Sequence, residues 1–239
     1  MYSEKQRIQT GIYGLDALIG GGFPLGRTYL VAGETGTGKT TFALQYLYRG
    51  IEYGDSGLYV TIDERPKHII EDATSLGWDL EKFIDENKLL IAELTPLFSD
   101  TMKIDAEQVI GELKGLISEI EAKRLAIDPI APLVLRGTEV LDPLAAQMVV
   151  RNYIRRLIFA LDELNITTVA TSEVPTGTRR LSRYGVEEFL ASGVIVLRFS
   201  RMNSGFVREL YIRKLRGVNH SLSVYNFVIQ RGRGIVIST

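Results

Sequence analysis

The feature that most constrains this chain is a glycine-rich segment, residues 33–40, which reads GETGTGKT. It fits the pattern G-x-x-x-x-G-K-S/T at every fixed position. An apolar run at 27–32 precedes it and predicts a buried strand, and helical spacing of apolar residues follows over 40–53. Here glycines let successive backbone N–H groups face inward, and the helix N-terminus adds its dipole. We therefore expect this segment, the phosphate-binding loop, to bind a nucleoside triphosphate, with Lys39 on the β- and γ-phosphates and the Thr40 hydroxyl on Mg²⁺.

Strand and helix patterns alternate through most of the sequence. Apolar runs predict further strands at 57–62, 89–92, 125–128 and 166–172. Helical patterns are found near 15–19 and over 66–76, 105–121 and 142–164. From residue 193 on, strands follow one another without helices, at 194–199, 206–213, 223–229 and 235–237. We expect an α/β fold with a mostly parallel central sheet flanked by helices, and antiparallel strands at its C-terminal edge.

Length and composition exclude several classes of protein. The 239 residues suit a single domain, residues 1–239, and 45% hydrophobic residues are ample for a core. The 28 Lys and Arg against 29 Asp and Glu argue against binding nucleic acid or membranes through bulk charge. Because there are no cysteines, disulfides, thiolate zinc sites and cysteine nucleophiles are excluded. No apolar run approaches the ~18 residues of a membrane span, and the polar start leads into no apolar segment, so we expect a cytoplasmic protein.

Carboxylates follow two of the predicted strands. Asp128 ends the strand at 125–128, where it could hold Mg²⁺, usually through water. Asp63 and Glu64 follow the strand at 57–62, and Asp63 is a rival for that role. An alternative for this acidic pair is to favour the start of the helix that Pro66 opens.

The sequence resembles a single KaiC-type domain of the RecA/RadA superfamily. The segments that carry the resemblance are GLDALIGGGFPLGRTYLVAGETGTGKTTFALQ, VTIDERP, SLGWDL, RYGVEEF and KLRGVNH, which extend over nearly the whole chain. The resemblance implies a RecA-type P-loop NTPase core that binds ATP and Mg²⁺ and hydrolyses ATP. It also implies a homo-oligomer, usually a hexameric ring, with the nucleotide between two subunits.

The resemblance assigns roles to the acidic residues and to the KLRG segment at 214–217. Glu64 would activate water with Asp63 in support, and Asp128 would hold Mg²⁺ together with Thr40. Lys214 and Arg216 would reach the γ-phosphate in the neighbouring subunit, where a cation supplied in trans neutralises developing charge. Without the resemblance, these two side chains would simply alternate outward on an exposed strand. The full set of expected nucleotide contacts is Gly36, Thr37, Gly38, Lys39, Thr40, Thr41, Ser75, Lys214, Leu215, Arg216 and His220.

Some of these assignments have simpler alternatives, and some positions depart from the family. Ser75 could cap a helix end, and a lone histidine such as His220 is often structural. The better-known clock proteins carry other side chains at four positions near the nucleotide, namely Val218, Leu222, Gln230 and Arg231. These changes leave base preference open, so ATP is favoured over GTP by resemblance alone. The clock proteins are tandems of two such domains, so a phosphorylation-based clock cycle is not implied.

Other functions fit the same sequence less well. Arg179, Arg180 and Arg183 cluster in the predicted loop at 173–185, where RecA-type recombinases carry a DNA-binding loop. Tyr184 is the only aromatic residue there, so single-stranded DNA is an alternative partner that we do not favour. A nucleotide-gated scaffold read by a signalling partner, or an autokinase, are further alternatives. Glu187 and Glu188 are predicted to cap a short helix or form salt bridges rather than to act in catalysis.

Overall fold

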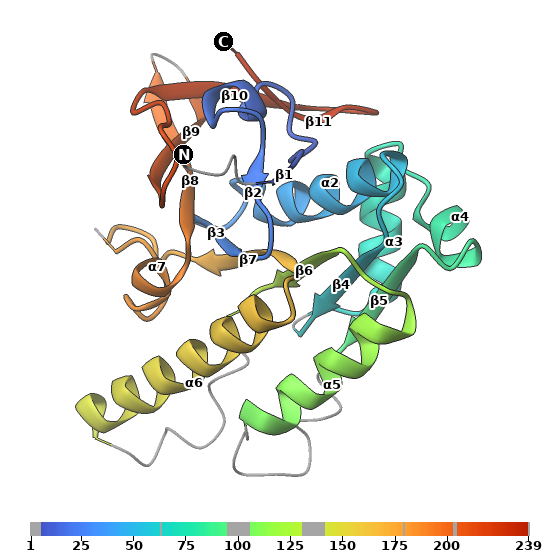
Figure 1. Cartoon of the computed structure of the whole chain (residues 1–239). Coiled ribbons are helices and arrows are strands. Elements are labelled where there is room, and N and C mark those ends of the chain that lie inside the picture. Colours follow the sequence, from blue (N-terminus) through green and yellow to red (C-terminus); the bar gives the residue numbers. More distant parts are fainter. Residues whose placement is uncertain are drawn as a thin grey trace, which may run out of the picture.

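The computed structural model describes residues 6–62, 64–94, 106–130, 142–178, 180–202 and 205–238. A nine-stranded sheet runs through the described part of the chain in the order β11-β10-β9-β8-β3-β7-β6-β4-β5 (Figure 1). Its parallel strands are β3 (Thr28–Gly33), β4 (Gly57–Thr61), β5 (Leu89–Glu93), β6 (Arg124–Asp128), β7 (Thr167–Glu173) and β8 (Gly193–Met202). Antiparallel pairing adds β9 (Gly205–Leu215), β10 (Val224–Gln230) and β11 (Gly234–Ile237) beyond β8.

Helices cover both faces of this sheet (Figure 1). Successive side chains of β3 alternate between two buried clusters, so that Leu30 faces one and Tyr29 the other. The first cluster includes apolar residues of α5 (Ala106–Glu119) and α6 (Pro143–Glu163). The second includes residues of α1 (Leu15–Leu18), α2 (Lys39–Glu52), α3 (Pro66–Ser75) and α4 (Leu80–Asp85). The prediction of an α/β fold with a mostly parallel, helix-flanked sheet and an antiparallel C-terminal edge is therefore confirmed.

Three short elements were not predicted. β1 (Arg7–Ile8) and β2 (Phe23–Pro24) form a small antiparallel pair apart from the main sheet. α4 begins after Asp79, whose carboxylate accepts a hydrogen bond from the Lys82 amide at 3.1 Å. A further short helix, α7 (Glu187–Leu190), lies where Glu187 and Glu188 were expected to start one.

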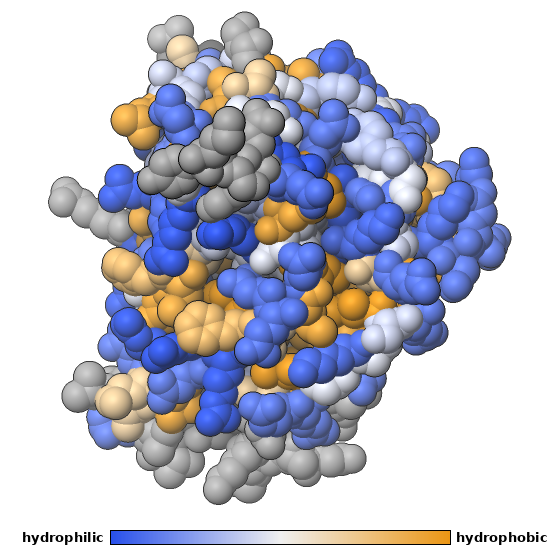
Figure 2. All heavy atoms as spheres, in the orientation of Figure 1, coloured by the Kyte–Doolittle hydropathy of each residue, from blue (hydrophilic) through white to orange (hydrophobic). Residues whose placement is uncertain are grey.

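The outer surface is mixed in character. Hydrophilic side chains cover most of the face in Figure 2, with apolar side chains in patches between them. Among the described residues, no helix is both long and apolar enough to span a membrane. Asp63, Arg179 and the helix start expected at Asp105 lie outside the described residues.

Candidate functional site

The phosphate-binding loop connects β3, which lies between β7 and β8, to the start of α2. Gly36 and Gly38 have φ angles of 80° and 108°, in the left-handed region that favours glycine. Helix α2 begins at Lys39, and its N-cap residue Gly38 offers no side chain to the first N–H groups. A helix N-terminus with free N–H groups is suited to an anion, as the motif predicted.

Lys39 is poised inside this loop. Its Nζ donates a hydrogen bond to the Glu34 carbonyl at 2.9 Å, and the Thr37 hydroxyl donates to the same oxygen at 2.7 Å. Burial lowers the pKa of Lys39, whereas the carboxylates of Asp128 and Glu173 oppose that shift. The structure thus brings Lys39 and Asp128, two of the predicted site residues, to one end of the sheet.

Asp128 is held by two neighbouring strands. The Tyr59 hydroxyl on β4 donates to Asp128 Oδ2 at 2.7 Å, and the Thr171 hydroxyl on β7 donates to Oδ1. Tyr59 is fully buried, and burial together with the Asp128 charge raises its pKa well above the usual value. The phenol therefore stays protonated and keeps donating. Sequence reasoning missed both side chains, because only the strand order places β4 and β7 on either side of β6.

Glu64 lies just beyond the end of β4, in a turn fixed by Thr61. The Thr61 hydroxyl donates to the Glu64 carbonyl at 2.8 Å and accepts from the Glu64 amide at 3.1 Å. Burial raises the pKa of Glu64, and the nearby charges of Asp72 and Asp128 add to the shift. The N-cap position of α3 is taken by Arg65, so Glu64 does not occupy it.

Lys214 and Arg216 lie away from the phosphate-binding loop of their own chain. Gly33 pairs with Leu197 of β8, whereas Lys214 pairs with Val194, three residues earlier. At about 3.3 Å per residue, that offset is about 10 Å along the strands, with two strand spacings across. The two cations therefore belong to the opposite end of the sheet.

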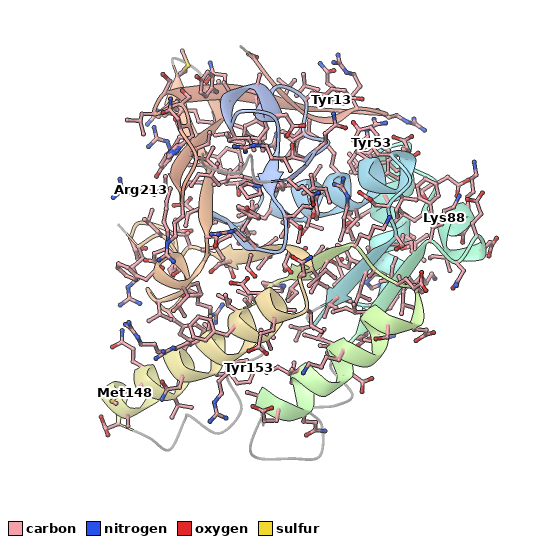
Figure 3. All side chains as sticks on the ribbon, viewed as in Figure 1. Tyr13, Tyr53, Lys88, Met148, Tyr153 and Arg213 are labelled. Carbon is pink, nitrogen blue, oxygen red and sulfur yellow. The ribbon has the colours of Figure 1, made fainter. Side chains whose placement is uncertain are left out.

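A short helix holds both cations. Lys214 Nζ donates to the Glu188 and Phe189 carbonyls of α7 at 2.8 and 3.3 Å, and Arg216 Nη2 donates to the Phe189 carbonyl at 2.8 Å. By contrast, the exposed Arg213, which precedes Lys214 on β9 and is labelled in Figure 3, extends outward from the strand. Burial lowers the pKa of Lys214 to about 8; the Arg216 charge acts in the same direction and the Glu188 charge opposes it. Leu215, between the two cations, is 5% exposed and packs in the core.

The remaining predicted contacts have partners of their own. The Ser75 hydroxyl is exposed and donates to the Asp72 carbonyl at 2.7 Å, which matches the helix-end alternative. His220 Nδ1 lies 3.1 Å from the Val218 carbonyl, and its buried Nε2 has no hydrogen-bond partner among the described residues. Thr40 and Thr41 are half-buried in the first turn of α2.

Two contacts to the phosphate-binding loop were not predicted. Arg208 on β9 donates from Nη2 to the Gly36 carbonyl at 3.3 Å, and its guanidinium lies 5.4 Å from the Phe199 ring centroid. The Thr35 hydroxyl donates to Glu173 Oε1, at the end of β7, at 2.5 Å. Because β7 lies beside β3 and β9 lies next to β8 on the other side, these strands carry side chains to the loop that no local sequence pattern marks.

Arg183, one of the arginines considered for DNA binding, contacts a carboxylate of β7. Arg183 Nη1 lies 3.5 Å from Glu173 Oε2. Two further arginines lie on α6: Arg156 pairs with Glu107 of α5 at 3.8 Å, and the Arg155 guanidinium lies 5.2 Å from the Phe159 ring centroid. Arg155 and Arg156 thus lie on a solvent-exposed face of α6, and the Arg183 contact ties the loop after β7 to Glu173.

Comparison with known proteins gives a consistent result. A family model described as "ATPase: KaiC" matches residues 8–239. The circadian clock oscillator protein KaiC of Prochlorococcus marinus is 41% identical over 236 residues, which cover 95% of this chain and 44% of that protein. The protein of the same name from Synechococcus elongatus is 39% identical over 240 residues, with 95% and 44% covered. The chain thus spans about 44% of the length of these relatives.

A solved structure matches over a greater share of its length. The crystal structure of a KaiC-like protein from the hyperthermophilic archaeon Pyrococcus horikoshii superposes with a TM-score of 0.84 at 38% sequence identity. The match covers 98% of this chain and 99% of that chain. The resemblance expected from the sequence motifs is confirmed by all three comparisons.

Proposed function

Because this chain belongs to the KaiC family of ATPases, we propose that it hydrolyses Mg-ATP at a site completed by a second copy of the chain. Residues 1–239 would form one such ATPase domain within a homo-oligomeric ring, with a hexamer as the proposed size. One observation carries the proposal. Lys39, Asp128 and Glu64 gather at one end of the parallel strands, whereas Lys214 and Arg216 lie at the other.

The donor set suits Mg²⁺. Thr40 and Asp128 offer hard oxygen ligands, and Mg²⁺ is usually held by one or two carboxylates together with substrate phosphates and waters. Tyr59 and Thr171 fix both carboxylate oxygens of Asp128, as neighbours of a metal ligand commonly do. Bound Mg²⁺ would neutralise charge on the β- and γ-phosphates.

The chain's own residues would then carry the reaction. Lys39 would turn from the Glu34 carbonyl to the phosphates, beside the N–H groups of the loop. Glu64 would orient a water in line with the γ-phosphorus and accept its proton as the P–O bond to the β-phosphate breaks, which releases ADP and inorganic phosphate. Its raised pKa suits a proton acceptor.

Lys214 and Arg216 would complete the site of a neighbouring subunit. They lie at the opposite end of their own sheet, where carbonyls of α7 accept their hydrogen bonds. Cations of this kind stabilise the charge on the departing phosphate and make hydrolysis depend on assembly. We further propose a regulatory role in the cytoplasm, in which a protein partner reads the nucleotide state.

The first test is steady-state phosphate release from Mg-ATP. Glu64→Gln should lower kcat by roughly 10²- to 10⁴-fold, the usual contribution of general base catalysis. Glu71→Gln is the matched control, because Glu71 forms an exposed pair with Lys67 on α3 at 3.5 Å. Turnover that survives Glu64→Gln would overturn the assignment of the base. Strong stimulation by single-stranded DNA would instead favour the recombinase alternative.

Complementation tests the shared site. Lys39→Ala removes the phosphate contact, and the double variant Lys214→Ala, Arg216→Ala removes the cations. Neither variant should hydrolyse ATP alone, but their mixture should regain activity at interfaces that join an intact loop to intact cations. If each variant still assembles with the wild-type chain but the mixture is as inactive as either variant alone, the role in trans is contradicted.

A further inference from the structure

Glu187 is a buried carboxylate with no part in the reaction proposed above. Its side chain is 0% exposed. Ser182 donates to Glu187 Oε2 at 2.6 Å, and the backbone amides of Tyr184 and Val186 lie within 3.3 and 3.1 Å of its carboxylate oxygens. A carboxylate taken out of water is costly unless several donors replace the water, and here they do. Glu187 therefore fixes the loop before α7 to the first residue of that helix.

The same helix holds the two cations. The carbonyls of Glu188 and Phe189 accept the hydrogen bonds from Lys214 and Arg216. The Glu188 carboxylate also lies against the Ser182 hydroxyl, whose single proton is shared between the two carboxylates, so Ser182 contacts the first two residues of α7. A displacement of this loop would therefore displace the groups that hold the cations.

The loop is tied in turn to the phosphate-binding loop. Ser172 of β7 donates to Glu187 Oε1 at 3.3 Å and accepts from the Arg183 amide at 3.1 Å. Arg183 pairs with Glu173, whose other carboxylate oxygen accepts from Thr35. A continuous set of polar contacts thus runs within one chain from the phosphate-binding loop to α7. We call it the relay, and its members are Thr35, Glu173, Arg183, Ser172, Ser182 and Glu187.

We propose that the relay couples the nucleotide bound at one chain's phosphate-binding loop to the position of the Lys214 and Arg216 that this chain lends to its neighbour. Glu173, Arg183 and Glu187 act as positioning residues. This inference rests on the proposed function, because it needs the two cations to act in trans. Its consequence is that occupied sites in the assembly influence one another.

Glu173 is the member that can respond to the nucleotide. Its carboxylate has a tight contact with Thr35 at 2.5 Å and a loose one with Arg183 at 3.5 Å. Its charge acts on Lys39, and a triphosphate in the loop would bring several negative charges to the same place. Repulsion then favours Arg183 over Thr35, so Arg183 and the loop that carries it shift. The side chains of Glu173 and Arg183 are about half exposed, at 45% and 43%, which leaves room for this exchange.

Cooperativity in ATP hydrolysis tests the relay. The rate of phosphate release is measured against ATP concentration for the assembled wild type, Glu173→Gln and Arg183→Gln, and Hill coefficients are compared. We expect a wild-type coefficient above 1 and variant coefficients that fall to about 1, because coupling between sites is lost. Arg183→Lys keeps a cation beside Glu173 and should retain the wild-type value, a rescue that a merely structural role would not require.

Control variants distinguish a failure of the relay from a failure of the proposed ATPase function. Glu71→Gln removes another exposed ion pair and should leave the coefficient unchanged. Glu187→Gln should lower the Hill coefficient to about 1, as Glu173→Gln and Arg183→Gln do. If Glu187→Gln does not fold, the two surface variants still decide the test. A wild-type coefficient of 1, or Glu173→Gln with the wild-type coefficient, overturns the relay even where complementation succeeds. Failed complementation overturns the role in trans instead.

Discussion

The hydrogen bond from Tyr59 to Asp128 is the contact at this site whose effect can be worked out most fully. Tyr59→Phe removes only the hydroxyl, which donates to Asp128 Oδ2 at 2.7 Å from a side chain that is 0% exposed. The bond from Thr171 to the other carboxylate oxygen remains. Asp128, the proposed Mg²⁺ ligand, would then be held on one side only, and a carboxylate that is less firmly oriented binds a metal ion more weakly.

Two magnitudes follow from this contact. Loss of a neighbour that orients a metal ligand typically costs 10- to 100-fold in metal affinity, so the Mg²⁺ concentration for half-maximal activity should rise by about tenfold or more. A hydrogen bond to a charged acceptor contributes about 1.5–3 kcal/mol, so the free energy of unfolding should fall by about 2 kcal/mol. Both changes should appear together in one variant.

Tyr29→Phe provides the matched control. Tyr29 is 1% exposed and donates to the Pro24 carbonyl at 2.7 Å, a neutral acceptor away from Asp128. It should cost about 1 kcal/mol of stability and leave the Mg²⁺ dependence unchanged. Phosphate release is titrated with Mg²⁺ at fixed ATP, and unfolding is followed in urea. If Tyr59→Phe has the Mg²⁺ dependence of the wild type and no greater loss of stability than Tyr29→Phe, the reasoning is refuted.

Two further predictions concern Lys214 and the core. Because burial lowers the pKa of Lys214 to about 8, kcat/KM for ATP should fall as pH rises through about 8 and the side chain loses its proton. Lys214→Arg should remove that alkaline decline in a pH–rate profile, since a guanidinium keeps its charge; a decline unchanged in the variant would assign it elsewhere. A Cβ on Gly50 would lie 2.1 Å from Nε of Arg124, which is 1% exposed and paired with Asp55 at 2.8 Å. Gly50→Ala should therefore lower the free energy of unfolding by about 3 kcal/mol. Gly111→Ala, with no described atom within 4 Å of its Cβ, should raise it by up to about 1 kcal/mol; equal effects in urea unfolding would contradict the steric argument.

The sequence predicted the architecture because its strongest signals are local. The phosphate-binding loop fixes a strand before it and a helix after it, and the structure has β3 and α2 at those positions. The change from alternating elements to consecutive strands at residue 193 predicted the antiparallel edge. Helix α4 was missed because its six residues are too few for a periodic pattern. Its buried Leu80 and Phe83 stabilise it through tertiary packing instead.

Residues of the candidate site could be predicted from the sequence only where a local pattern marks them. Lys39 and Thr40 follow from the loop, and Asp128 follows from its place at the end of a strand. Tyr59 and Arg208 were missed because their roles depend on which strands are neighbours. Strand order is a long-range property of the fold, and a single sequence without a family comparison leaves it open.

The geometry supports the proposal that one chain carries halves of two different sites. The C-terminal ends of parallel strands lie at the same end of the sheet, so Lys39 and Asp128 share that end. β9 runs antiparallel to β8, so its last residues, including Lys214, lie at the opposite end of the sheet. Within one chain, Lys214 is offset from Gly33 by about 10 Å along the strands. In the proposed function, cations held by α7 at the second end act on a nucleotide that another chain presents, and the relay would be the path within each chain by which the two ends influence one another.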